Sequence, residues 1–158
     1  MAVIHYFAYG SNMNPERVRG RSMEFDHHQA GSLHDYRLAF NKRSAKFPGS
    51  ASANVVTHSG EITEGVVYQL QHPDQISMMD PYEGYPHRYD RIPVPIICEL
   101  EVVEAWVYIA NESHIAEGLR PNRWYLEHLL AGKQFLSGSY VQRLESVECL
   151  PDSHTEPK

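Results

Sequence analysis

Short runs rich in aromatic and β-branched residues recur along the first two thirds of the chain and predict β-strands, because such side chains favour extended backbone. The runs are "YFAYG" (6–10), "YRLAF" (36–40), "ANVVTH" (53–58), "EGVVYQL" (64–70) and "EVVEAWVYIA" (101–110). Residues 59–64 predict a hairpin or close pairing of the third and fourth runs, and Gly31–Ser32 predicts an interruption of the extended stretch 23–41. Pro93 and Pro95 predict an edge strand or an irregular pairing around them.

Helical signals occur near the start of the chain, at its middle and throughout its last third. Asn14 is expected to cap a short helix whose first position is Pro15. Residues 72–84 predict a second short helix, which Pro81 and Gly84 are expected to stop. Two later segments carry apolar residues at helical spacing: "RPNRWYLEHLLAGKQF" (120–135) and "SGSYVQRLESV" (137–147).

The order of these elements predicts the fold class. Strands dominate the middle of the chain, with no regular alternation of strand and helix and no internal repeat. This pattern predicts an α+β fold in which a mixed, mainly antiparallel sheet curls into a small barrel with peripheral helices. The length of 158 residues predicts a single domain over residues 1–150, followed by a polar tail at residues 151–158.

Charge and hydropathy narrow the choice of partners. The formal net charge is −6, and Lys and Arg are scattered among acidic residues, so neither nucleic acid nor a membrane surface is expected as a partner. The first residues lack the positive region and the long apolar core of a signal peptide. The most apolar later run carries Glu99, Glu101 and Glu104, so no membrane span is expected and a cytoplasmic location is favoured.

Cysteine and histidine positions give no support for a metal site. Cys98 and Cys149 are far apart and form no CxxC motif, so two free thiols are expected rather than a disulfide framework or a zinc site. The densest histidine cluster is His27, His28 and His34. Neighbouring residues of a strand point to opposite faces, so His27 and His28 are not expected to share a metal ion.

Two features can carry chemistry, and each has a structural alternative. The turn "YGSN" (Tyr9–Asn12) suits a tight bend between strand and helix without any ligand. Consecutive backbone N–H groups before a helix also form a cradle for a carboxylate or a developing oxyanion. Glu83, expected just beyond the short helix, is either an exposed helix-end residue or a carboxylate in a pocket.

Taken together, the two features resemble the γ-glutamylcyclotransferase family. The motifs that carry the resemblance are "FAYGSNM" at 7–13 and "MDPYEGYPHRYDR" at 79–91. It continues through "YRLAFNKRS", "ANVV", "EGVVYQL" and "LRPNRWYLEHLLAGKQ", and so covers nearly the whole chain. Met79 replaces the family's usual Leu, which conserves volume, and Asn122 replaces a Ser. The form "YGSN" resembles the γ-glutamylcyclotransferase branch more than branches with "YGTL" or "YGSL".

The resemblance implies a reaction without metal or cofactor. The α-amine of a γ-glutamyl amino acid or γ-glutamylamine would attack its own γ-carbonyl, giving 5-oxoproline and a free amino acid or amine. Glu83 would act first as general base and then as general acid, and Tyr6 and Tyr125 would complete the pocket, unless they only fill the core. The turn would bind the γ-glutamyl head through Tyr9, Gly10, Ser11 and Asn12.

Two other functions stay open on the sequence alone. One is a ligand-binding or interaction module of the same fold that does not turn over its ligand. The other is a cyclotransferase that removes a γ-glutamyl protecting group in a biosynthetic pathway, which would use the same site residues. Selectivity for the leaving amine is expected in the segments 42–53 and 108–120. A homodimer is compatible with the sequence.

Overall fold

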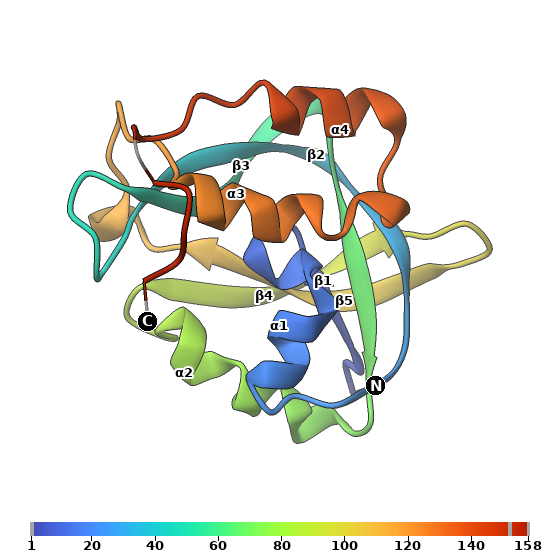
Figure 1. Ribbon diagram of the computed structural model, residues 1–158. Coiled ribbons are helices and arrows are strands. Elements are labelled where there is room, and N and C mark those ends of the chain that lie inside the picture. Colours follow the sequence, from blue (N-terminus) through green and yellow to red (C-terminus); the bar gives the residue numbers. More distant parts are fainter. Residues whose placement is uncertain (1, 152, 158) are drawn as a thin grey trace.

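The computed structural model describes residues 2–151 and 153–157, and a closed barrel of five strands forms its centre (Figure 1). The strands are β1 (His5–Ala8), β2 (Phe25–Arg43), β3 (Ala51–Leu70), β4 (Tyr89–Ile97) and β5 (Val102–Ala110). Their order around the barrel is β1-β3-β2-β4-β5. The contact between β1 and β5 is parallel and the other pairs are antiparallel, which confirms the predicted mixed, mainly antiparallel barrel.

Helices surround this barrel, and Figure 1 shows α3 and α4 running side by side over it. The α-helices are α1 (Pro15–Gly20), α2 (Asp80–Glu83), α3 (Arg123–Leu130) and α4 (Gly138–Glu145). The 3-10 helices are η1 (Ser11–Met13), η2 (Pro73–Met78), η3 (Glu112–His114) and η4 (Lys133–Phe135). The predicted cap is confirmed, because the Asn14 side chain accepts a hydrogen bond from the Glu16 N–H. None of the helices described is long and apolar enough to span a membrane.

The predicted hairpin at residues 59–64 is wrong. Residues 51–70 form the single strand β3, which pairs with β2 along most of its length, so the hairpin is the one between β2 and β3. The predicted interruption at Gly31–Ser32 is also wrong, because β2 runs through both residues.

A pair of glycines explains why β2 and β3 continue without a break. Gly31 lies opposite Gly65 across the two strands. A Cβ atom on Gly31 would lie 2.5 Å from Val67 Cγ2, and one on Gly65 would collide with the Ala8 carbonyl oxygen and the ring of Phe7. The glycines therefore let the fully buried Phe7 pack inside a tightly curved wall, and of the two only Gly31 was interpreted from the sequence as an interruption.

Helix α2, the short helix that precedes β4, also differs from its predicted form. Pro81 does not stop α2 but lies in its first turn, where a proline costs no hydrogen bond. Glu83 is the last residue of α2 rather than a residue beyond it, and Gly84 then ends the helix with φ 73°. Glu83 thus has helical backbone, which fixes the direction of its side chain.

The two prolines of β4 agree with their prediction. Pro93 and Pro95 lie in a strand that pairs with β5 over its whole length. On its other side, within the described residues, the only backbone pairing of β4 with β2 is Ser32–Ile97. This side needs few backbone N–H donors, so proline is tolerated there.

The final segment of the chain lies against α3. Ser153 accepts hydrogen bonds from two backbone N–H groups at the start of that helix, those of Arg123 and Trp124. Glu156 accepts a hydrogen bond from Arg17 and contacts His128, at 3.3 Å and 2.7 Å. The division of the chain after residue 150 stays a prediction.

We expect Gly65→Ala to lower the free energy of unfolding by about 1–3 kcal/mol, because the added methyl group overpacks the barrel wall. Chemical denaturation followed by circular dichroism measures the change. Gly138→Ala is the matched control: nothing lies within 4 Å of its Cβ position, so this change should be neutral or slightly stabilising. Equal stability of the two variants would contradict the packing argument.

Candidate active site

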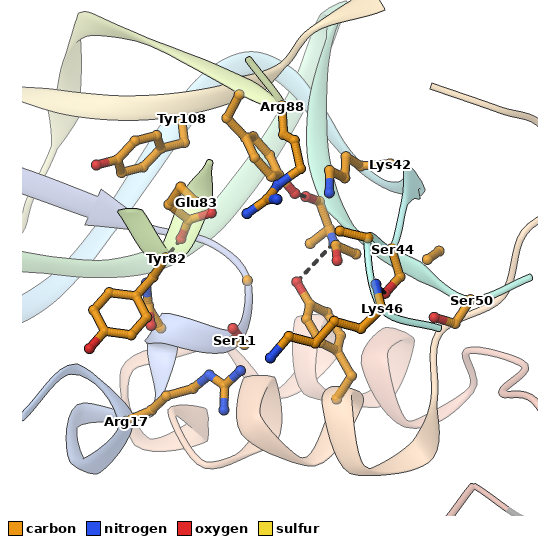
Figure 2. A pocket seen from close by; sticks show the side chains of 18 of the residues that line it. Ser11, Arg17, Lys42, Ser44, Lys46, Ser50, Tyr82, Glu83, Arg88 and Tyr108 are labelled. Carbon is orange, nitrogen blue, oxygen red and sulfur yellow. Dashed lines mark hydrogen bonds between the residues drawn. The ribbon is translucent and has the colours of Figure 1, made fainter. Parts of the chain in front are cut away.

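A cavity of about 350 Å³ opens beside the turn that follows β1. Its wall comes from that turn, from the β2–β3 connection, from α2 and from α3. The volume is at the lower end of the range of roughly 300–1,000 Å³ that is typical of small-molecule sites. Figure 2 shows side chains from these separate elements pointing towards one another across it.

The structure brings all of the residues selected from the sequence to this cavity. They lie far apart along the chain, in β1, the following turn, α2 and α3. The residues are Tyr6, Tyr9, Gly10, Ser11, Asn12, Glu83 and Tyr125.

The carboxylate of Glu83 contacts the turn through Asn12. The Asn12 side-chain amide donates to Glu83 Oε1 at 3.2 Å and to the Tyr6 hydroxyl at 2.9 Å. On its other side, Asn12 Oδ1 accepts a hydrogen bond from Arg21, whose guanidinium is 4.0 Å from Glu83. Asn12 is only 3% exposed, so its side chain orients Glu83 instead of facing the open cavity.

The pKa of Glu83 is raised above the ordinary value of a glutamate. Burial is the largest cause, because it disfavours the ionised form. Nearby positive charges act in the opposite direction and lower the pKa, but burial has the larger effect. These charges belong to Arg21, Lys42, Arg17 and Arg88. The side chain is 17% exposed, so Glu83 still reaches the cavity.

The helix that carries Glu83 is held to the barrel through its first residue, Asp80. Arg91 of β4 donates two hydrogen bonds to the Asp80 carboxylate, at 2.9 Å and 3.1 Å. The hydroxyl of Tyr108 in β5 donates a third at 2.7 Å. The Arg91 guanidinium lies between the rings of Tyr85 and Trp106, at 4.5 Å and 4.4 Å from their centroids. Two strands of the barrel therefore fix the position of α2.

The turn after β1 leaves backbone donors unused. The N–H of Met13 binds the Gly10 carbonyl oxygen, and the N–H of Asn14 binds that of Ser11. In the described part of the chain the N–H groups of residues 10–12 have no hydrogen-bond acceptor. Gly10 has φ −113°, and what it contributes is space: a Cβ atom there would lie 3.2 Å from the Tyr125 hydroxyl oxygen.

The hydroxyl groups of Tyr9 and Tyr125 differ in what they leave free. Tyr9 donates its hydrogen to the Tyr108 carbonyl oxygen at 2.6 Å. Tyr125 instead accepts the Ala53 N–H at 2.9 Å, which leaves its own hydrogen available to the cavity. Burial raises the pKa of Tyr125, so this phenol keeps its proton at neutral pH and can act as a donor.

A group of positively charged residues in the cavity wall was not predicted from the sequence. They are Arg17, Arg21, Lys42, Lys46 and Arg88. Arg17 and Arg21 gave no signal, because an arginine on a short helix is expected to face solvent. Lys42 and Arg88 lie inside segments quoted for the resemblance, yet only the folded chain brings them next to each other.

The other residues weighed from the sequence do not line this cavity. Cys98 is a buried free thiol just after β4, and Cys149 is a partly buried one. His28 packs against Phe25 and Tyr68 as part of an aromatic cluster. Among the described residues, no group of three or more His, Cys, Asp or Glu side chains is arranged to hold a metal ion.

We expect Glu83→Gln to stabilise the fold at neutral pH, because the folded state binds a proton on Glu83 more tightly than the unfolded chain does. The cost of ionising Glu83 is absent below its unfolded pKa of about 4.3 and is fully present above its raised folded pKa. The melting temperature of the variant should exceed that of the wild type at pH 7, and the difference should vanish near pH 4.

The control for this experiment is Glu127→Gln, which removes the same charge from an exposed position on α3. Its melting temperature should follow that of the wild type across the pH range. A Glu83→Gln variant that is less stable than the wild type at pH 7 would contradict the pKa argument.

The fold is shared with solved structures of low sequence identity. A γ-glutamyl cyclotransferase matches with a TM-score of 0.82 and 21% identity, over 98% of this chain and 94% of that one. An uncharacterised human protein has a TM-score of 0.81 and 23% identity, over 94% and 89%. A yeast γ-glutamyl cyclotransferase specific to glutathione has a TM-score of 0.67 and 15% identity, over 91% and 94%. No curated protein matches the chain.

A family model identifies the relationship more closely than these structures do. The model described as "Gamma-glutamyl cyclotransferase, AIG2-like" matches residues 6–127, which include the turn after β1, Glu83 and Tyr125. The chain therefore belongs to the AIG2-like γ-glutamyl cyclotransferase family.

Proposed function

We propose that the protein converts a γ-glutamyl amino acid or γ-glutamylamine to 5-oxoproline and the free amino acid or amine. The observation that carries this proposal is the position of Glu83, a carboxylate with raised pKa that lies in a cavity beside the turn 9–12. Family membership supports the same reaction type.

The proposed reaction needs one proton acceptor that later returns the proton. Glu83 takes a proton from the α-ammonium group of the substrate, and the freed amine attacks the γ-carbonyl carbon. The new C–N bond closes a five-membered ring and leaves a negative charge on the carbonyl oxygen. Glu83 then gives its proton to the leaving nitrogen, the carbonyl bond re-forms and the old C–N bond breaks. The ring nitrogen also loses its second extra proton, and the freed amine takes up one proton to become an ammonium group, so charges balance and no water is consumed.

A tethered nucleophile makes this reaction feasible without a metal or cofactor. Ring closure within one molecule can reach an effective molarity of about 10⁵ M when the bound conformation is close to the transition state. A raised pKa brings the carboxylate closer to neutrality, which suits a group that must both accept and donate a proton. Burial in the cavity is the physical cause of that shift.

Donors near the turn are suited to the charge that develops on the substrate. The N–H groups of Gly10 and Ser11 and the hydroxyl hydrogen of Tyr125 are available to a carboxylate or to the developing oxyanion. The side chain of Asn12 contributes by holding Glu83. Tyr6 and Tyr9 form the buried floor and complete the support of this arrangement.

The remaining parts of the proposal rest on the sequence. The protein is proposed to act in the cytoplasm, where its two free cysteines would remain reduced. A homodimer is still a prediction. A silent binding module of the same fold would not need a buried base, so the burial of Glu83 favours turnover over that alternative.

The first test is release of 5-oxoproline from a panel of γ-glutamyl dipeptides and γ-glutamylamines. We expect release by the wild type and a loss of about 10²–10⁴-fold in kcat for Glu83→Gln, because the general base is removed. Glu127→Gln should retain the wild-type rate. No release from any panel member by folded wild-type protein would favour the binding module.

The pH dependence provides a separate test of the proposed base. Only the ionised form of Glu83 can accept the proton, so kcat/KM should fall on the acid side with a midpoint above the value of about 4.3 that is usual for glutamate. Initial rates between pH 4 and pH 9 measure this midpoint. A midpoint at or below the usual value would exclude Glu83 in its buried state as the base.

A further inference from the structure

The cavity carries a positive charge that the chain as a whole does not. The formal net charge of the protein is −6, yet the cavity wall holds more positive than negative side chains. The negative ones are Glu83 and Glu156, and Glu156 already binds Arg17 and contacts His128. The proposed reaction makes use of Glu83, but it gives no role to Lys42, Lys46 or Arg88.

Lys42 is the least expected of these cations. It is only 4% exposed and lines the cavity. Within the described residues its ammonium group makes no hydrogen bond or ion pair, and it lies 5.3 Å from the centroid of the Tyr89 ring. Burial, with the nearby charge of Arg88, lowers the pKa of Lys42 to about 8. A buried cation without an anionic partner is costly, so its presence here fits a binding role for an anion.

Arg88 reinforces the charge at this place. The charge of Arg88 acts on both Lys42 and Glu83. Its guanidinium, like the Lys42 ammonium, makes no ion pair or hydrogen bond in the part of the chain that the structure describes. Figure 2 shows Arg88 between Glu83 and Lys42, with both cationic groups directed towards the interior of the cavity.

The neighbourhood of Lys42 lies apart from the turn after β1. Lys42 stands near the end of β2, and the β2–β3 connection follows directly. That connection is closed by hydrogen bonds from the Ser44 N–H to the Ser50 carbonyl oxygen and from the Phe47 N–H to Ser44 Oγ. In Figure 2, Lys42 and Ser44 lie together on one side, and Ser11 and Arg17 lie together on another.

We infer that Lys42 and Arg88 form an anion subsite for the leaving amine, so that the protein selects γ-glutamyl substrates whose leaving amine carries a carboxylate. The inference rests on the proposed function and deepens it. The carboxylate of the leaving amino acid or peptide pairs with the Lys42 ammonium, and the Arg88 guanidinium offers further donors to its oxygens.

A substrate of this kind carries two carboxylates, and the cavity offers donors for each of them on opposite sides. The α-carboxylate of the γ-glutamyl head belongs to the side of Ser11 and Arg17, because the neighbouring α-amine must reach Glu83, which is bound to the turn through Asn12. A second carboxylate, beyond the bond that breaks, then reaches the opposite wall. A leaving amine that is neutral gains nothing from this wall, and a cationic one is repelled by it.

The test compares γ-glutamyl-alanine with γ-glutamyl-alaninamide, which differ only in the charge of the leaving group. The wild type should prefer the carboxylate by about 10- to 100-fold in kcat/KM, as expected for a charge-assisted contact. γ-Glutamyl-ethylenediamine, with a cationic leaving group, should be the poorest of the three. A wild type that turns over the amide or the cationic substrate as well as γ-glutamyl-alanine would overturn the inference without any variant.

Lys42→Met then assigns the preference to its residue. The change removes the charge and nearly conserves length, and it should reduce the ratio between the two alanine substrates towards one. The ratio is the correct readout, because the loss of Lys42 also alters the pKa of Glu83 and so affects both substrates alike. Arg43→Met is the matched control: it removes the next cation of β2, which is exposed outside the cavity, and should keep the ratio.

The outcomes separate this inference from the proposed function. Release of 5-oxoproline with an unchanged ratio in Lys42→Met and in a parallel Arg88→Met variant would overturn the subsite and retain the reaction, whether or not the rates for both substrates fall together. If no substrate is turned over, calorimetric binding to the wild type decides: tighter binding of γ-glutamyl-alanine than of its amide supports the subsite alone, and equal or absent binding overturns it.

Discussion

The contact between Asp80 and two strands of the barrel is the interaction on which the proposed chemistry depends. Helix α2 has only four residues, and a helix so short has no stability of its own. Its position comes from the three hydrogen bonds that Asp80 accepts from Arg91 and Tyr108. Because these are charge-assisted contacts of a largely buried carboxylate, they are stronger than neutral ones and define one geometry. Glu83 follows three residues later in the same helix, so the contacts of Asp80 also fix the direction of the Glu83 side chain.

Opposing electrostatic effects meet at Glu83. Burial alone would favour a neutral acid, and a surrounding shell of cations alone would favour a permanently ionised one. Both act here, with burial the larger, and the result is a carboxyl group with a raised pKa that still responds to the charges around it. The same cations serve a bound anion, so charge in the substrate and proton affinity of the base are linked through one set of side chains.

Local signals in the sequence predicted much of the fold and of the candidate site. The Asn14 cap, the spacing of the leucines in α3 and the prolines of β4 each depend on nearest neighbours, and each agrees with the structure. The turn 9–12 and Glu83 were found because two motifs coincide with a family pattern. The hydrogen bond of 3.2 Å from the Asn12 side-chain amide to Glu83 Oε1, which joins the two motifs, could not be predicted from either motif alone.

What the sequence did not predict depends on distant contacts. Gly31 was expected to interrupt a strand, but Gly31 and the opposite Gly65 instead leave the space that Phe7 and Ala8 occupy. Asn12 was placed in a turn that binds through its backbone, and the hydrogen bonds of its side chain to Tyr6, Glu83 and Arg21 appear only in the folded chain. In the sequence Lys42 is one polar residue near the end of a strand, and only the folded structure shows that it is buried and lines the cavity.

Closure of the barrel joins segments that lie at very different separations along the chain. Strands β2 and β3 are neighbours in the sequence, so their long hairpin needs only a short loop to close. The parallel contact of β1 with β5 joins Tyr6 to Trp106, across most of the chain, and contacts of such separation form slowly. The turn 9–12 follows β1 directly. The position of the turn, and with it the candidate site, therefore depends on a strand whose contact with β5 closes the longest loop of the barrel.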